Sequence, residues 1–150
     1  MKNILLSCAI FLSSLLIANP VETGHAKASL ISNLQNSNQE SFYVGIRLQM
    51  QDGWHTYWEN PGDSGSPFDA EWTTDDGVIV ENVQWPTPIT IPYPPLMTYG
   101  YEGDIVFPFQ VFRSQETNLK EIKVDFNFLI CADICIPESA SLSLDLSVIA

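Results

Sequence analysis

The stretch IKVDFNFLICADICIPESASLSLDLSV, residues 122–148, decides the fold. In its first and last parts every second residue is apolar. The apolar positions are Ile122, Val124, Phe126, Phe128 and Ile130, then Leu142, Leu144, Leu146 and Val148. Such alternation is typical of antiparallel strands that bury one face. Two of these strands around a short middle segment predict a β-hairpin with its apolar face turned inward.

The same alternation recurs in residues 41–50 and 105–111. No window beyond the first residues shows a sustained helical period, and clusters of Gly and Pro separate the apolar runs as turns. Several short strands with such turns predict a single all-β domain, an antiparallel β-sandwich of immunoglobulin-like type. The four tryptophans are expected to pack in this sandwich or to close its ends. They are Trp54, Trp58, Trp72 and Trp85.

The N-terminus resembles an export signal. Lys2 precedes an apolar run from Ile4 to Ala18, and the A-x-A pattern Ala26-Lys27-Ala28 follows. We therefore expect a secretory signal peptide at residues 1–28, cleaved after Ala28, and a β-sandwich domain at residues 29–150. In the remainder no apolar run approaches the roughly 20 residues of a membrane span. The mature domain is thus expected to be periplasmic, without membrane insertion.

Charge and cysteine count narrow the function. Loss of Lys2, Lys27 and Glu22 with the signal peptide changes the net charge from −12 to −13. A chain this acidic lacks the clustered Lys and Arg that bind phosphates, so nucleic acid is excluded as a partner. Loss of Cys8 leaves Cys131 and Cys135, which can form one disulfide in an oxidising compartment.

Geometry limits how Cys131 and Cys135 can meet. Within one extended strand they would lie about 13 Å apart, too far for a disulfide. A tight hairpin solves this if Ala132, Asp133 and Ile134 form the turn and the cysteines face each other across the ladder. As a structural staple this bridge adds little, because closing a loop of about five residues contributes only ~2 kcal/mol on the chain-entropy model.

Two other roles are open to the pair. With His55 and Met97 it could bind a soft ion such as Cu(I), although no spacing in the sequence demands a metal, and we expect no cofactor. Alternatively it could cycle between dithiol and disulfide. Asp133 and Glu138 lie close in sequence and disfavour a thiolate, so we expect a partner to supply or uncover the activating group.

Three motifs, taken in order, resemble one family. They are GWHTYW at residues 53–58 running into NPGD, YGYEG at residues 99–103, and the CxxxC-IPE segment at residues 131–138. Together they resemble the periplasmic N-terminal domain of the DsbD and ScsB group of thiol:disulfide interchange proteins. The resemblance covers roughly residues 40–148. The three-residue spacing between the cysteines is similar to ScsB, which is linked with suppression of copper sensitivity, whereas DsbD has a longer spacing.

The resemblance implies an immunoglobulin-like domain that takes electrons from a membrane-embedded thiol reductase and passes them to periplasmic thioredoxin-like proteins. It implies Cys135 as the nucleophile and Cys131 as the resolving thiol. It also implies an aromatic cap around the cysteines, with Tyr99, Gly100 and Tyr101 as the counterpart and Thr98 where DsbD has Phe. The GWHTYW motif adds Trp54, His55 and Tyr57 as supporting residues. Members of the group continue into a membrane domain and a thioredoxin-like domain, so the donor is either a separate protein or a missing part of a longer chain. The pathway could be cytochrome maturation, disulfide isomerisation or copper tolerance.

Overall fold

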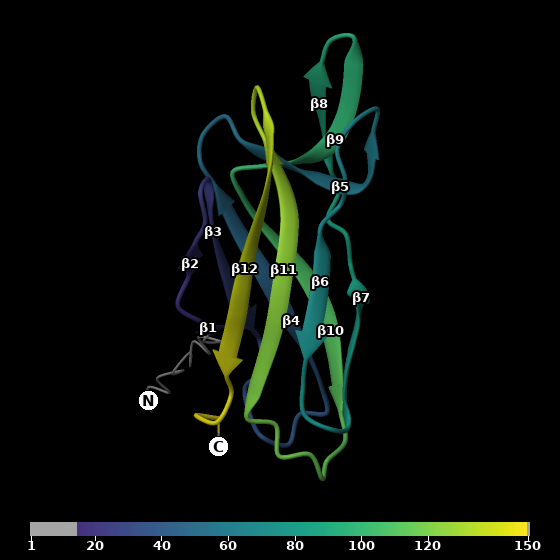
Figure 1. Cartoon of the computed structure of the whole chain (residues 1–150). Coiled ribbons are helices and arrows are strands. Elements are labelled where there is room, and N and C mark those ends of the chain that lie inside the picture. The colour runs from purple at the N-terminus through teal and green to yellow at the C-terminus, as the bar shows by residue number, and fades with distance from the viewer. Residues whose placement is uncertain (1–14, 150) are drawn as a thin grey trace, which may run out of the picture.

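Two antiparallel β-sheets face each other in the computed structural model, which describes residues 15–149 (Figure 1). One sheet has the strand order β1-β3-β4-β10-β7, with β2 also paired to β3. The other has the order β12-β11-β5-β9-β8, with β6 also paired to β11. Every regular element of the described residues is a strand. The predicted all-β, immunoglobulin-like antiparallel sandwich is therefore confirmed.

The twelve strands have the following bounds. They are β1 Leu16–Ile17, β2 Val21–Glu22, β3 Ala26–Ser32, β4 Ser41–Met50, β5 His55–Gly62, β6 Asp69–Thr73, β7 Val78–Val83, β8 Ile89–Tyr93, β9 Leu96–Glu102, β10 Asp104–Arg113, β11 Glu121–Cys131 and β12 Cys135–Asp145.

The four predicted strands form as β4, β10, β11 and β12, and their alternating residues build the core between the sheets. The innermost side chains are Phe42, Val44, Ile46, Leu48, Phe107, Val111, Ile122, Val124, Phe126 and Ile130. The four tryptophans are partly buried and pack against this core, as expected. The prediction that Val148 points into the core is wrong, because this residue is 71% exposed. Strand β12 ends at Asp145, whose carboxylate accepts hydrogen bonds from Ser147, so the alternation stops there.

Strand β3 lies within the stretch that we expected to be a signal peptide. It runs antiparallel to β4 from Ala26↔Met50 to Ser32↔Val44, and Ala26 and Ala28 are buried in the core. The expected cleavage after Ala28 thus falls inside a core strand, and that cleavage stays a prediction. Residues 1–14, with Cys8 and most of the apolar run, lie outside the described part of the chain. Between residues 15 and 149 no helix is long and apolar enough to cross a membrane.

The three sequence motifs of the family resemblance lie near one end of the sandwich. The β11–β12 turn and the β8–β9 hairpin both project there (Figure 1). The start of β5 joins them, because His55 is paired with Cys131 of β11 on one side and with Glu102 of β9 on the other. The β8–β9 turn consists of Pro94 and Pro95, joined by a cis peptide bond.

Candidate active site

The two cysteines meet at the end of the β11–β12 hairpin. Cys131 is the last residue of β11, Cys135 is the first of β12, and the two are direct cross-strand partners. Their Cα atoms lie 4.1 Å apart and their sulfurs form a disulfide. Residues 132–134 make the turn, as predicted. The long ladder behind it, which runs back to Glu121↔Asp145, holds the cysteines face to face.

The two cysteine residues differ in exposure. The Cys131 residue is 1% exposed, whereas Cys135 is exposed. Ile134, next to Cys135 in the turn, is 64% exposed. A partner molecule that approaches this end of the sandwich therefore meets Cys135 first, with Cys131 behind it.

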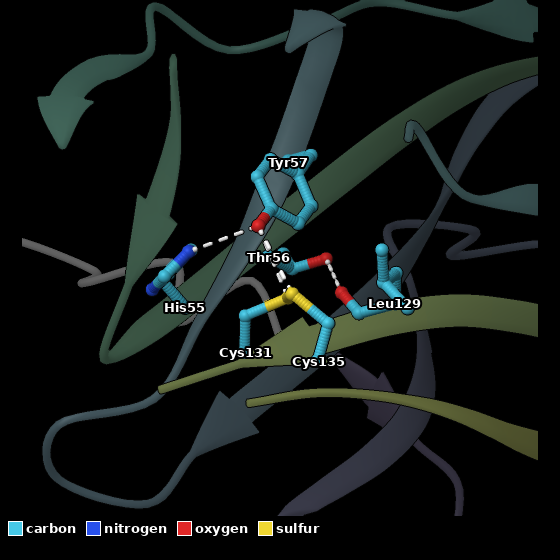
Figure 2. Close-up of a disulfide and its surroundings, with 6 residues drawn as sticks. All are labelled: His55, Thr56, Tyr57, Leu129, Cys131 and Cys135. Carbon is cyan, nitrogen blue, oxygen red and sulfur yellow. Dashed lines mark hydrogen bonds between the residues drawn. A yellow bond between two sulfur atoms is a disulfide. The ribbon is translucent and has the colours of Figure 1, made fainter. Parts of the chain in front are cut away.

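The Tyr57 side chain contacts both sulfurs from the side (Figure 2). Its hydroxyl lies 3.0 Å from Cys131 Sγ and 3.5 Å from Cys135 Sγ. On its other side the same hydroxyl lies 3.3 Å from His55 Nε2. Tyr57 and His55 are 2% and 9% exposed. A buried row thus runs from the His55 imidazole through the Tyr57 hydroxyl to the disulfide.

Strand β5 positions this row by its alternation. His55 and Tyr57 are two residues apart, so both side chains point to the same face of the sheet, toward the cysteines. Thr56 between them points the other way, and its hydroxyl donates a 2.9 Å hydrogen bond to the Leu129 carbonyl of β11 (Figure 2). That bond and the His55↔Cys131 pairing fix β5 against β11.

A small cavity of about 100 Å³ opens beside the disulfide. It is lined by His55, Tyr57, Ser64, Tyr93, Thr98, Cys131, Ala132, Asp133 and Cys135. Ser64, Tyr93 and Thr98 carry no sequence signal that marks them as site residues. They reach the cavity because the β5–β6 loop and the β8–β9 hairpin fold over it. Tyr93 is 52% exposed and forms part of the outer rim.

The expected cap residues lie around this site rather than against the sulfurs. Tyr99 is 37% exposed and contacts the Trp58 ring edge-on, at 6.4 Å between centroids. Tyr101 is buried, and its hydroxyl donates to the Pro86 carbonyl. Gly100 pairs with Tyr57 across the β5–β9 ladder. None of these three residues lines the cavity. The β9 residue that does so is Thr98, which precedes Tyr99.

A thiol:disulfide site of this form has a known counterpart. The family model described as "Thiol:disulfide interchange protein DsbD, N-terminal" matches residues 27–147. The chain belongs to this family. The resemblance drawn from the three sequence motifs is thereby confirmed.

A solved DsbD-type domain also shares the fold. The crystal structure of the N-terminal periplasmic domain of ScsB from Proteus mirabilis aligns with a TM-score of 0.68 and 25% sequence identity. The alignment covers 89% of this chain and 52% of that one, so this chain spans about half the length of the ScsB domain. A comparison with curated protein sequences finds no match.

The IPE segment of this DsbD-type domain ties the cysteine hairpin to the N-terminal strands. The Glu138 carboxylate accepts hydrogen bonds from the Thr23 hydroxyl, from the His25 backbone N–H and from the His25 ring. The His25 ring also stacks on Trp54, with centroids 3.8 Å apart. Burial raises the pKa of Glu138, but these hydrogen bonds together outweigh it and hold the pKa below its ordinary value. Trp54, expected as a supporting residue, thus supports Glu138 through His25.

Burial sets the charge state of the two β5 side chains in the DsbD-type site. It lowers the pKa of His55 from its ordinary value, although the nearby Glu102 carboxylate opposes the shift. Burial also raises the pKa of Tyr57, and a hydrogen bond with the Ser64 side chain lowers it by a smaller amount. At neutral pH both groups are therefore uncharged. Among the described residues no group of three His, Cys, Asp or Glu is arranged to hold a metal, and Met97 does not line the cavity.

Reduction of the disulfide is expected to lower the free energy of unfolding by only about 2 kcal/mol, because the bridge closes a loop of five residues. The β11–β12 ladder holds both strands in either redox state. Urea unfolding of the oxidised and reduced domain, followed by tryptophan fluorescence, measures the difference. A loss above about 4 kcal/mol would mark the bridge as a structural staple and contradict a cycling role.

Proposed function

We propose that this domain is a periplasmic carrier of reducing equivalents. In this proposal the Cys131/Cys135 pair receives two electrons from a membrane-embedded thiol reductase and delivers them to periplasmic thioredoxin-like proteins. The observation that carries the proposal is a disulfide between one exposed and one buried cysteine, held at the end of a long hairpin ladder. Membership of the DsbD N-terminal family supports the same chemistry.

The difference in access supports the roles of the two cysteines. During reduction of the domain, a donor thiolate attacks Cys135 Sγ, the disulfide breaks, and its electron pair passes to Cys131 Sγ. The second donor thiolate then attacks the donor sulfur of the mixed disulfide and releases Cys135. During delivery, the Cys135 thiolate attacks the acceptor disulfide, and Cys131 attacks Cys135 Sγ to release the reduced acceptor. Each cycle transfers two electrons and needs no cofactor.

The surroundings of Cys135 support a protein partner. Ile134, next to Cys135 in the β11–β12 turn, is a large exposed apolar side chain. Tyr93, which lines the cavity, is also exposed, and Leu96 on the β8–β9 hairpin adds a third. Exposed apolar groups next to a reactive group are typical of protein interaction sites. The expected export signal and the periplasmic ScsB relative support the periplasm as the compartment.

A redox titration tests this proposal. The purified domain is equilibrated in glutathione buffers, and its free thiols are counted by alkylation and mass. We expect a midpoint between about −180 and −270 mV, the range of known exchange proteins. A midpoint below about −300 mV would mark a structural disulfide and favour a passive module that binds a partner or copper.

A further inference from the structure

The Ser64 hydroxyl is a hydrogen-bond neighbour of the Tyr57 hydroxyl. Three further neighbours can accept the Tyr57 proton. They are Cys131 Sγ, Cys135 Sγ and His55 Nε2. A disulfide sulfur is a weak acceptor, whereas a thiolate is a strong one. The preferred direction of the hydroxyl therefore depends on the state of the sulfurs. When the disulfide is intact the neutral imidazole competes well for this proton, and when a thiolate forms the proton turns toward sulfur.

Cys131 needs a base that no partner can bring to it. A thiol of ordinary pKa is only about 3% ionised at pH 7, and a buried site lowers that fraction further. The Cys131 side chain is shielded from solvent, and its one side-chain hydrogen bond among the described residues comes from Tyr57. Partner groups can reach Cys135 but not Cys131. The means of ionising Cys131 must therefore lie within the domain.

His55 is the nearest group with a suitable basicity. It is buried between β11 and β9. The Glu102 carboxylate of β9 acts on its charge, and Asp133 of the β11–β12 turn lines the same cavity. Tyr93 of β8 lines the same cavity and is uncharged. The Glu102 carboxylate favours the protonated imidazole, so a proton that arrives at His55 is stabilised there. Burial keeps the ring neutral until that happens.

We infer that His55 acts through Tyr57 as the proton acceptor for Cys131 when Cys131 resolves a mixed disulfide. This inference rests on the proposed exchange function and adds the group that activates its second step. The Cys131 thiol gives its proton to the Tyr57 oxygen, and the Tyr57 hydroxyl proton passes to His55 Nε2. The Cys131 thiolate then attacks Cys135 Sγ, the bond from Cys135 to the acceptor sulfur breaks, and the acceptor leaves as a thiolate. In the opposite direction the same row returns the proton to Cys131 as it leaves the disulfide.

This role differs from our expectation from sequence, in which a partner supplies the activating group. No base lies near Cys131 along the chain, but the β5–β11 pairing brings one from 76 positions away. Tyr57 contacts the reacting sulfur, whereas His55 is a positioning residue that acts through it. A substitution of His55 should therefore change the pH dependence of resolution without changing the first attack by Cys135.

The test separates the two steps in His55→Gln and Tyr57→Phe. The reduced domain is mixed with glutathione disulfide between pH 5.5 and 9 and quenched with acid. Mass spectrometry then counts the glutathione adduct and the intramolecular disulfide. Tyr43→Phe is the matched control, because Tyr43 is an exposed tyrosine on β4, far from the sulfurs in the opposite sheet.

For the wild type we expect resolution to stay fast to below about pH 6.5, because burial holds the pKa of His55 below that ordinary histidine value. In both variants we expect it to slow by about tenfold per pH unit below the ordinary thiol pKa of about 8.5. At pH 7, about 1.5 units below that thiol pKa, the variants should then be roughly thirtyfold slower than wild type. In His55→Gln, which keeps Tyr57 against Cys135, formation of the adduct should stay within about twofold of wild type.

Identical pH profiles of resolution in wild type and His55→Gln would overturn the inference while leaving the exchange function intact. A wild-type domain that forms neither the adduct nor the intramolecular disulfide would refute the exchange function itself. If neither variant folds, NMR titration of His55 in the wild type decides the question. The ring should titrate differently in the oxidised domain and in the domain alkylated at Cys135 alone, where Cys131 is free. Identical titrations would overturn the inference.

Discussion

Replacement of Cys135 by serine is expected to abolish disulfide exchange with a thioredoxin-like acceptor. The serine hydroxyl is a poor nucleophile, and the remaining thiol of Cys131 is shielded from solvent and beyond direct contact by a partner. We expect reduction of the acceptor to fall to the rate of the buffer alone. Acceptor thiols are counted by alkylation after incubation with the reduced domain. The fold should persist, since the disulfide contributes only about 2 kcal/mol.

Replacement of Cys131 by serine is the matched control for this experiment, because it removes the other member of the pair. Its Cys135 still attacks the acceptor, but no thiol remains to resolve the product. We therefore expect a stable mixed disulfide between the domain and the acceptor, visible as a covalent complex without reducing agent. If Cys135→Ser formed this complex and Cys131→Ser did not, the two roles would be reversed.

Replacement of Gly100 by alanine is expected to destabilise the domain by about 3 kcal/mol, at the upper end of the usual cost of overpacking. A Cβ atom at this position would lie 2.0 Å from the Thr56 carbonyl oxygen and 3.1 Å from Tyr57 Cα. Both are backbone atoms, so β5 and β9 must separate. Because Gly100 pairs with Tyr57, the separation should also move the Tyr57 hydroxyl away from Cys131. Urea unfolding gives the stability, and the glutathione-adduct assay gives the rate of resolution.

Gly103→Ala is the matched control in the same region. Gly103 has φ of +70°, but a Cβ there meets no atom within 4 Å. We expect a loss of only about 1 kcal/mol, the cost of the left-handed backbone conformation, with unchanged resolution. Equal losses in the two variants would contradict the close approach of β9 to β5 as the reason for glycine at position 100.

The cysteine hairpin could be predicted from the sequence because its determinants are local. The alternation in residues 122–130 and 142–146 sets which face is buried, and the cysteine spacing sets the length of the turn. The same pattern wrongly predicted that Val148 is buried, because a polar–apolar alternation does not mark where a strand ends. The end of β12 depends on the hydrogen bonds from Ser147 to the Asp145 carboxylate, and the alternating pattern carries no information about these bonds.

The surroundings of the disulfide could be predicted only in part because they depend on contacts between strands far apart in sequence. The GWHTYW motif pointed to His55 and Tyr57, but not to the hydrogen bonds that connect them to the sulfurs. Tyr93 and Thr98 line the cavity because of the β8–β9 register, and no local signal fixes that register. Tyr99, named by resemblance to a cap, faces Trp58 instead of lining the cavity.

The position of β3 has a consequence for the expected signal-peptide cleavage. Ala26-Lys27-Ala28 is both the pattern that a signal peptidase recognises and the first part of a strand paired with β4. A peptidase needs an extended, accessible chain, whereas Ala26 and Ala28 are buried once the sheet has formed. Cleavage after Ala28 must therefore precede folding, and it would remove Thr23 and His25 from Glu138. Cleavage upstream of Thr23 would keep β3 whole and those contacts intact. If a signal peptidase cuts at this pattern, cleavage and folding compete for the same residues, and their order would decide which N-terminus results.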